Sequence, residues 1–158
     1  MGGSPAGAPC HHLMFPAVAF VLYSLLVQDS VTFRVHAPTS VHAGEPVPIQ
    51  LVLTNRTERR LALTLQGRPL AFDITVRRDD GSVVWRRLEG QVVSAILALR
   101  ELAPADSLTF EALWDGRMAD GRPAPPGRYQ LVGRLPTDTP EGLTTLPVSL
   151  QILAVHAE

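Results

Sequence analysis

The sequence has no lysine and only one cysteine, Cys10, among its 158 residues. A single thiol excludes an intrachain disulfide, and it also excludes a zinc site built on several thiolates. The fold must therefore be held together by packing alone. A reducing compartment fits this composition but is not required by it.

Charge of either sign is scarce, with 14 basic and 15 acidic residues and a formal net charge of -1. A chain this close to neutrality has no global field that would steer it to nucleic acid. The basic residues are all arginines and lie beside acids, as Arg77-Arg78 lie beside Asp79-Asp80. The few aromatic residues fall on the apolar phase of alternating segments, which argues against a platform for stacking bases. We therefore expect no nucleic-acid partner.

Motifs for catalysis are also missing. No G-x-S-x-G occurs, and Cys10 has no activating residues around it. The run from Gly116 to Gly121 resembles a phosphate-binding loop, but Arg122 and Pro123 stand where Lys and Ser or Thr are needed. The sequence thus predicts a non-catalytic protein with no catalytic residue, no cofactor and no small-molecule substrate.

Histidine offers little for a metal ion. His11-His12 lie in the glycine- and proline-rich start, and His36 and His42 flank the first loop of the domain. Two imidazoles without a nearby Cys, Asp or Glu at ligand spacing are a weak metal signal. We predict no metal site and interpret these residues as surface groups.

One long apolar run is present, from Leu13 to Val27. We expect residues 1–29 to comprise a disordered start and this signal-like or anchor-like segment, and residues 30–158 to form the domain. No basic residue precedes Arg34, no A-x-A follows the run, and about 20 residues are needed to span a bilayer.

Three interpretations of the apolar run remain open: an atypical export signal or anchor, a mis-assigned gene start, or an extra strand or helix packed on the domain. The first slightly favours an exported or membrane-anchored location, with a cytoplasmic one as the alternative. Membrane contact is expected only through this segment, if it is retained.

From Ser30 onward, apolar and polar residues alternate, and turn residues interrupt the alternation about every ten residues. Such alternation places one side of each strand in a core and the other in water. The pattern predicts an all-β, immunoglobulin-like antiparallel sandwich of seven or eight strands, with an apolar N-terminal segment. The segment from Leu88 to Leu102 is ambiguous between a helix and an edge strand with a crossing segment, and its neighbours favour the strand.

The stretch AFDITVRRDDGSVVWRR, residues 71–87, is predicted to be a hairpin rather than a carboxylate site. Asp80-Gly81 would supply the positive backbone angles of a tight turn, and the apolar phase continues at Val83 and Trp85. A catalytic carboxylate pair would need a shielded environment, which nothing nearby supplies. Trp85 and Trp114 are expected to fill the core, and Tyr129 to form a tyrosine corner.

Four ordered pieces resemble the BsuPI-type intracellular proteinase inhibitor family, a bacterial immunoglobulin-like domain. They are AGEPVPIQLVLTN, RPLAFDITVRRDDGSVVWR, LAPADSLTFEALWDG and PPGRYQLVGRL. The family's usual P-G-E turn appears here as Pro104-Ala105-Asp106. The resemblance implies a framework made of Asn55, Phe72, Asp73, Trp85, Trp114, Gly127 and Tyr129.

The resemblance also implies a protein partner, with a serine proteinase as the candidate target. The candidate contact is the loop from Asp115 to Pro126, held extended by its prolines, with Arg117, Met118 or Arg122 entering a specificity pocket. The alternative is a structural or accessory envelope domain that docks on a partner without inhibiting it. Such docking would use a sheet edge, at Leu146–Val155 or Val92–Leu102.

Overall fold

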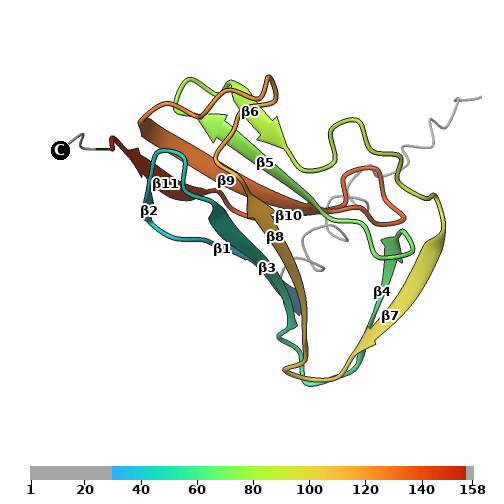
Figure 1. The fold of residues 1–158 in the computed structure, drawn as a ribbon. Coiled ribbons are helices and arrows are strands. Elements are labelled where there is room, and N and C mark those ends of the chain that lie inside the picture. The colour runs from blue at the N-terminus through green and yellow to red at the C-terminus, as the bar shows by residue number, and fades with distance from the viewer. Residues whose placement is uncertain (1–29, 156–158) are drawn as a thin grey trace, which may run out of the picture.

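A computed structural model of the chain describes residues 30–155, which form a β-sandwich with a two-stranded ribbon at one end (Figure 1). The apolar run and the first two histidines lie outside the described residues. Eleven strands occur in this range: β1 (Val31–His36), β2 (Ser40–His42), β3 (Val47–Asn55), β4 (Leu61–Gln66), β5 (Asp73–Arg78), β6 (Val83–Arg86), β7 (Leu97–Leu102), β8 (Ser107–Trp114), β9 (Gly127–Leu135), β10 (Leu143–Thr144) and β11 (Val148–Leu153).

The two main sheets have the arrangement of an immunoglobulin sandwich. One sheet has the order β1-β3-β8 and the other the order β2-β11-β9-β5-β6, with β10 also paired to β9. These sheets match the ABE and GFCC′ strands of that fold, so the predicted fold class is confirmed. The pairing of β2 with β11 is parallel, whereas the other strand pairs are antiparallel.

The core lies between the two main sheets, and its side chains come from alternate positions of the strands. On β3, Val47, Ile49, Leu51 and Leu53 are buried while the residues between them are more exposed. A Cβ atom placed on Gly133 of β9 would collide with the Leu51 side chain, so glycine lets the sheets approach closely there. The two-residue periodicity of the sequence therefore reports the core correctly along β3 and β9.

The predicted hairpin is present as β5 and β6, but its turn differs from the expected one. Gly81 has a φ of +84°, whereas Asp80 keeps a negative φ, and the N–H of Arg78 donates to the carbonyl of Ser82 at 2.9 Å. The loop thus has three residues instead of two, and one glycine is enough to close it. A bulge shifts the register after Val76.

The bulge changes which side chains of β6 face the core. It buries Val84 and leaves Val83 exposed, so the expected apolar phase at Val83 is wrong. An inserted residue in one strand interrupts the alternation of its side chains, which a regular two-residue pattern cannot anticipate.

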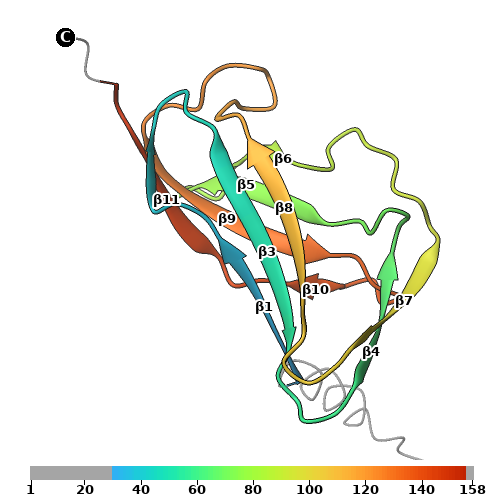
Figure 2. The same ribbon diagram turned by 60° about the horizontal axis from the view of Figure 1, so that its bottom comes forward.

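The ambiguous segment contributes β7, which pairs with β4 in a ribbon that projects from the sandwich (Figure 2). The preceding residues, 88–96, form a turn and an irregular connection, and no helix is present in this segment. The strand was therefore the better of the two interpretations, and tertiary pairing with β4 decided it.

Two other expectations need correction. Residues 30–155 contain eleven strands instead of seven or eight, because β2 and β10 are too short to produce a visible alternation and β7 lies in the ambiguous segment. The predicted edge at Leu146–Val155 is wrong over residues 151–153, where β11 lies between β2 and β9. Leu146 is exposed before that strand begins.

Among residues 30–155, no helix has the length and apolar character needed to cross a bilayer.

Candidate protein-binding site

The candidate loop, residues 115–126, joins β8 to β9 and folds back on itself as a small hairpin. The N–H of Ala124 donates to the carbonyl of Gly116 at 2.8 Å, and the N–H of Gly121 donates to that of Met118 at 2.9 Å. Gly121 closes the tip with a φ of +82°, a conformation that favours glycine. The expectation of an extended loop is therefore wrong at the tip, because the chain reverses there.

The carbonyl oxygens of all three candidate residues are already engaged. The indole N–H of Trp114 donates to the Arg117 carbonyl at 2.6 Å. The Met118 carbonyl accepts from Gly121, and the Arg122 carbonyl accepts from the N–H of Met118 at 2.8 Å. A proteinase that cleaved after one of these residues would have to take that carbonyl into its oxyanion hole. Cleavage therefore requires the tip to open first.

The three candidate side chains lie in different environments. Arg117 is exposed, and its Nη1 donates to the Gly121 carbonyl at 2.9 Å. Arg122 pairs with Asp120 at 2.6 Å. This side-chain contact raises the pKa of Arg122 and lowers the pKa of Asp120 from the ordinary value of 3.8. Met118 is half-buried against the core, so the two arginines are the exposed members of the three candidates.

The tip also rests on the neighbouring β5–β6 hairpin. The N–H of Ala119 donates to the carbonyl of Val84 at 2.8 Å. The Nη2 atom of Arg78 lies 3.6 Å from the sulfur of Met118. Both contacts fix the loop to the end of the sandwich.

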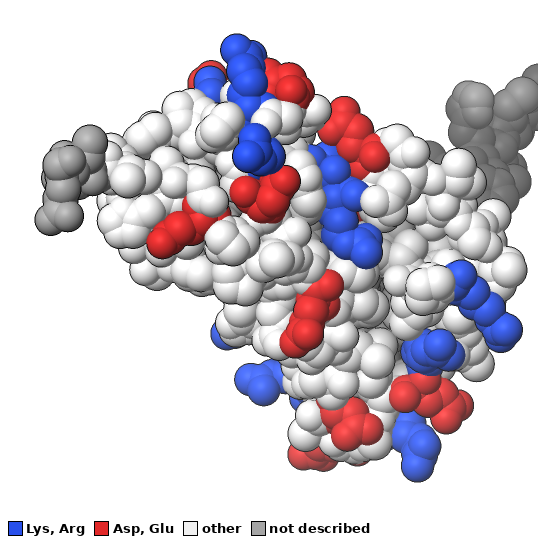
Figure 3. Space-filling model, in the orientation of Figure 1, with Lys and Arg blue, Asp and Glu red and all other residues white. Residues whose placement is uncertain are grey.

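Acidic and basic side chains are interspersed over the face of the molecule seen in Figure 3, with no broad patch of one sign.

An aromatic cluster supports the base of the loop. Trp114 is fully buried. Its ring centroid lies 6.1 Å from that of Trp85, at an interplanar angle of 29°, and 6.2 Å from that of Tyr129. The Tyr129 hydroxyl donates to the carbonyl of Pro125 at 2.6 Å, which is the bond of a tyrosine corner. Gly127, with a φ of +151°, leads into β9. Both ends of the loop are thus tied to buried rings.

Phe72 and Asp73 hold the chain where it leaves β6. The guanidinium of Arg87 lies 3.6 Å above the Phe72 ring, and burial lowers the pKa of Arg87. Asp73 is nearly buried, accepts from Arg86 Nε at 2.8 Å and accepts from the N–H of Leu88 at 3.1 Å. These bonds anchor the irregular connection that leads to β7.

Asn55 joins three segments at the opposite end of the sandwich. Its side chain is fully buried, and its Nδ2 donates to the carbonyls of Arg59, Leu102 and Ala103 at 2.8–3.1 Å. Its Oδ1 accepts from the N–H of Thr57 at 2.9 Å. The run Asn55-Arg56-Thr57 is formally a glycosylation sequon, but a glycan on this amide would replace these bonds, so Asn55 acts as a structural hub.

The family profile described as BsuPI, intracellular proteinase inhibitor, matches residues 35–139, which is more than half of the chain. The chain belongs to this family. The family description supports a proteinase inhibitor role and makes a proteinase the expected class of partner, and "intracellular" is compatible with the cytoplasmic alternative. Among curated proteins, none matches the sequence.

Several solved structures are similar to this BsuPI domain at low identity. The sporulation control protein Spo0M from Bacillus subtilis gives a TM-score of 0.46 at 11% identity, over 81% of this chain and 50% of its own. The CARDB domain of PF1109 from Pyrococcus furiosus gives a TM-score of 0.43 at 10% identity, over 80% of this chain and 94% of its own. The DNA glycosylase AlkC from Pseudomonas fluorescens gives a TM-score of 0.43 at 13% identity, over 78% of this chain and 30% of its own.

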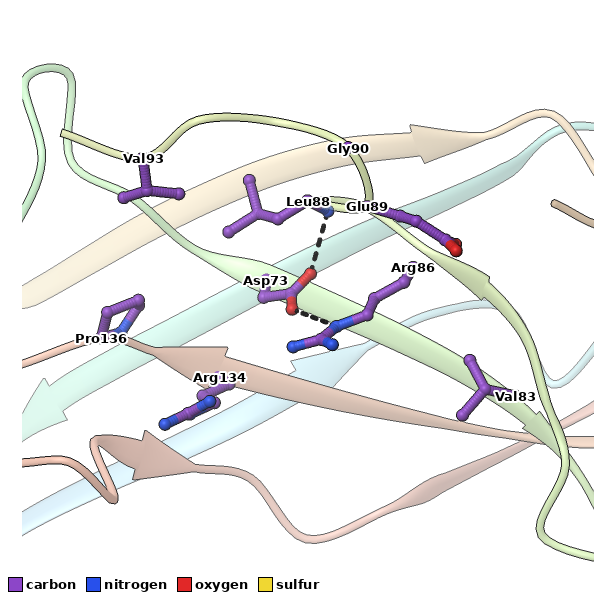
Figure 4. A pocket seen from close by; sticks show the side chains of 9 residues that line it. All are labelled: Asp73, Val83, Arg86, Leu88, Glu89, Gly90, Val93, Arg134 and Pro136. Carbon is purple, nitrogen blue, oxygen red and sulfur yellow. Dashed lines mark hydrogen bonds and ion pairs between the residues drawn. The ribbon is translucent and has the colours of Figure 1, made fainter.

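A groove of about 540 Å³ in this BsuPI domain lies over the outer face of β5, β6 and β9 (Figure 4). Three of its four charged groups, Asp73, Arg86 and Arg134, are committed to the fold. Asp73 binds Arg86, and the Nη2 of Arg134 donates to the Pro140 carbonyl at 2.6 Å. Within residues 30–155, no buried side-chain nitrogen or oxygen lacks a partner, and no group of three or more potential metal ligands gathers.

Sequence reasoning identified the position of the loop in this BsuPI domain but missed its internal structure. The dipeptide Asp120-Gly121 carries a usable signal, because D-G is typical of a hairpin turn. In the structure Gly121 closes the turn, and Asp120 pairs with Arg122. The bond from Trp114 to the Arg117 carbonyl has no sequence signal, because it depends on how far the buried indole reaches.

Proposed function

We propose that this domain inhibits a serine proteinase by presenting the tip of the β8–β9 loop as a folded wedge. The wedge consists of residues 116–124, and Arg117 is its principal contact. Arg117 enters an acidic specificity pocket, while the chain around it keeps its hairpin conformation. The observation that carries the proposal is the engagement of the Arg117 carbonyl by the buried indole of Trp114.

Rigidity of the tip favours binding over cleavage. A loop that is already ordered loses little conformational entropy when it docks. The bonds from Trp114 and Gly121 hold the candidate carbonyls away from an oxyanion hole. The wedge therefore blocks the cleft as an obstacle and does not behave as a substrate.

Arg117 is the best-suited cation of the tip. The Arg122 charge is compensated by Asp120, whereas Arg117 takes part in none of the ion pairs found among residues 30–155. An exposed guanidinium without a carboxylate partner loses no ion pair on entering an acidic pocket. This argument favours serine proteinases of trypsin-like specificity, whose pocket carries an aspartate.

The test is a titration of the full-length chain against a panel of serine proteinases, with chromogenic substrates and mass spectrometry of the recovered chain. We expect inhibition at micromolar concentration without cleavage. The Arg117→Gln variant should weaken inhibition by roughly tenfold or more, while Arg117→Lys retains part of it and Arg34→Gln on β1 leaves it unchanged. Unchanged proteinase rates for the parent chain would refute the proposal, and rapid cleavage after Arg117 would mark a substrate.

A docking domain without inhibitory activity is the second candidate. The observation that favours it is the outer edge of β7, which no other strand of residues 30–155 covers and which lies within one of the two sheet edges that the sequence suggests. The same titration separates the two functions, because a docking domain leaves all proteinase rates unchanged. N-terminal sequencing of the native protein would decide whether the apolar run is retained and in which compartment the partner should be sought.

A further inference from the structure

The β7 strand and the residues before it carry an unusual concentration of exposed apolar side chains. Val92 is fully exposed, Ile96 and Leu97 are each 52% exposed, and Leu99 is 62% exposed. They are four of the nine large apolar residues exposed within residues 30–155. Single exposed leucines are ordinary, but such a cluster on one short segment marks an interaction surface.

The backbone of β7 is also open along its outer side. The carbonyl of Ile96 accepts from the N–H of Gly67, so Ile96 faces the β4 side of the ribbon. By alternation, Leu97, Leu99 and Glu101 direct their N–H and C=O groups away from β4. Among the described strands, β7 pairs with β4 alone, and both views of the ribbon place β7 at the margin of the molecule (Figures 1 and 2). An unpaired edge with apolar side chains is a template for another strand.

We propose that this edge pairs with β7 of a second copy of the chain, antiparallel and across a two-fold axis. With a two-fold axis perpendicular to the ribbon, each residue whose N–H and C=O groups point outward must face another such residue of the second copy. The register centred on Leu99 uses all three outward-facing residues. It sets Leu99 opposite Leu99 of the partner subunit and Leu97 opposite Glu101 of the partner subunit. The two ribbons then form one four-stranded sheet.

The charges on β7 fit this register. Arg100 lies opposite Ala98 of the partner subunit, and no like charges face each other. If the pairing were shifted by two residues so that it centred on Arg100, Arg100 would face Arg100 of the partner subunit. If it were shifted the other way, to centre on Ala98, Glu101 would have no strand residue opposite it. Self-complementarity of this kind favours a second copy over an unrelated extended peptide.

The test uses the full-length chain and sedimentation velocity over a hundredfold range of concentration. We expect a species of twice the 17.1 kDa chain mass that dissociates on dilution. Leu99→Lys places two ammonium groups on the axis and should give a monomer at every concentration. Leu113→Lys is the matched control, because Leu113 on β8 is 64% exposed, and it should associate like the parent. Both positions are exposed, so the denaturation midpoints of the parent and the two variants should be equal at concentrations where the parent is a monomer.

Two further measurements locate the contact. In a Cys10→Ser background, Leu99→Cys should form a disulfide-linked dimer under mild oxidation and Leu113→Cys should not, since residues paired across an antiparallel ladder lie about 5.5 Å apart. Amide exchange at Leu97, Leu99 and Glu101 should be slow in the parent and at least about tenfold faster in Leu99→Lys.

A monomeric parent would overturn the proposal, even with slow exchange at these amides, because protection would then come from within the chain. Association that survives Leu99→Lys unchanged would also overturn it and place the contact elsewhere. Neither result depends on whether the β8–β9 loop inhibits a proteinase.

Discussion

The N–H of Ala105 donates to the carbonyl of Asn55 at 3.1 Å, and Ala105 is the only non-glycine residue with a positive φ, +65°, among residues 30–155. Asn55 Nδ2 in turn donates to the carbonyl of Ala103 on the same turn. The β7–β8 turn is therefore held in a left-handed conformation by the buried amide that closes β3. This position is where the family's usual turn has glycine.

Replacing Ala105 by glycine should stabilise the domain. The left-handed region costs an L-residue about 1–2 kcal/mol, and the extra freedom of glycine in the unfolded chain offsets about half of that. We expect a net gain of about 0.5–1 kcal/mol in the free energy of unfolding, measured by urea denaturation. The control, Ala103→Gly, has an ordinary backbone and should lose stability. A lower midpoint for Ala105→Gly would contradict the strain at this turn.

Asn55→Asp should destabilise the domain by about 3–5 kcal/mol at neutral pH. The replacement keeps the shape of the side chain but removes the Nδ2 donor, leaving a buried carboxylate among three carbonyl oxygens. Urea denaturation at several pH values measures the effect, and the deficit should shrink at low pH, where the introduced carboxyl is protonated. Gln130→Glu at an exposed position on β9 serves as the control. Equal losses in the two variants would argue against the hub.

Trp114→Phe should make the loop tip easier to cleave. It keeps a ring in the core but removes the indole N–H that holds the Arg117 carbonyl. Loss of this bond, worth about 1–1.5 kcal/mol, should raise cleavage by trypsin after Arg117 roughly tenfold. Mass spectrometry of timed digests measures the rate, and cleavage after Arg100 in the same digest is the internal reference. An unchanged ratio of the two rates would mean that the indole does not hold the tip.

The ion pair at the loop tip should respond to acid. The pKa of Asp120 is lowered from 3.8 by the Arg122 side chain, with a smaller part from the Arg122 N–H. Its contribution to order at the tip is therefore present above pH 3.8 and is lost as pH falls through the lower folded-state pKa. Carboxyl NMR titration of Arg122→Gln should show the Asp120 pKa returning towards 3.8. Asp80, whose pKa is lowered by Ser82, should titrate unchanged.

The long strands of the main sheets were predictable because each alternates over several residues and has one buried face, whereas β2 and β10 are too short to show this pattern. The β5–β6 hairpin was predictable as an element, but its three-residue turn and the bulge at Val84 were not, since both depend on pairing with a partner strand. The position of the candidate loop followed from its Gly and Pro content. Its folded tip did not, and the expected extended form was wrong.

The amino-acid sequence is enough to specify an all-β domain with a core on alternate residues, because burial of one strand face requires a two-residue period. It also determined the tyrosine corner, through the placement of Tyr129 near the start of a strand. Two further features follow from tertiary packing alone: Trp114 holds the Arg117 carbonyl, and β7 lies at an edge that no other described strand covers. Both depend on contacts between segments distant in sequence, and no local pattern specifies which strands or rings will meet.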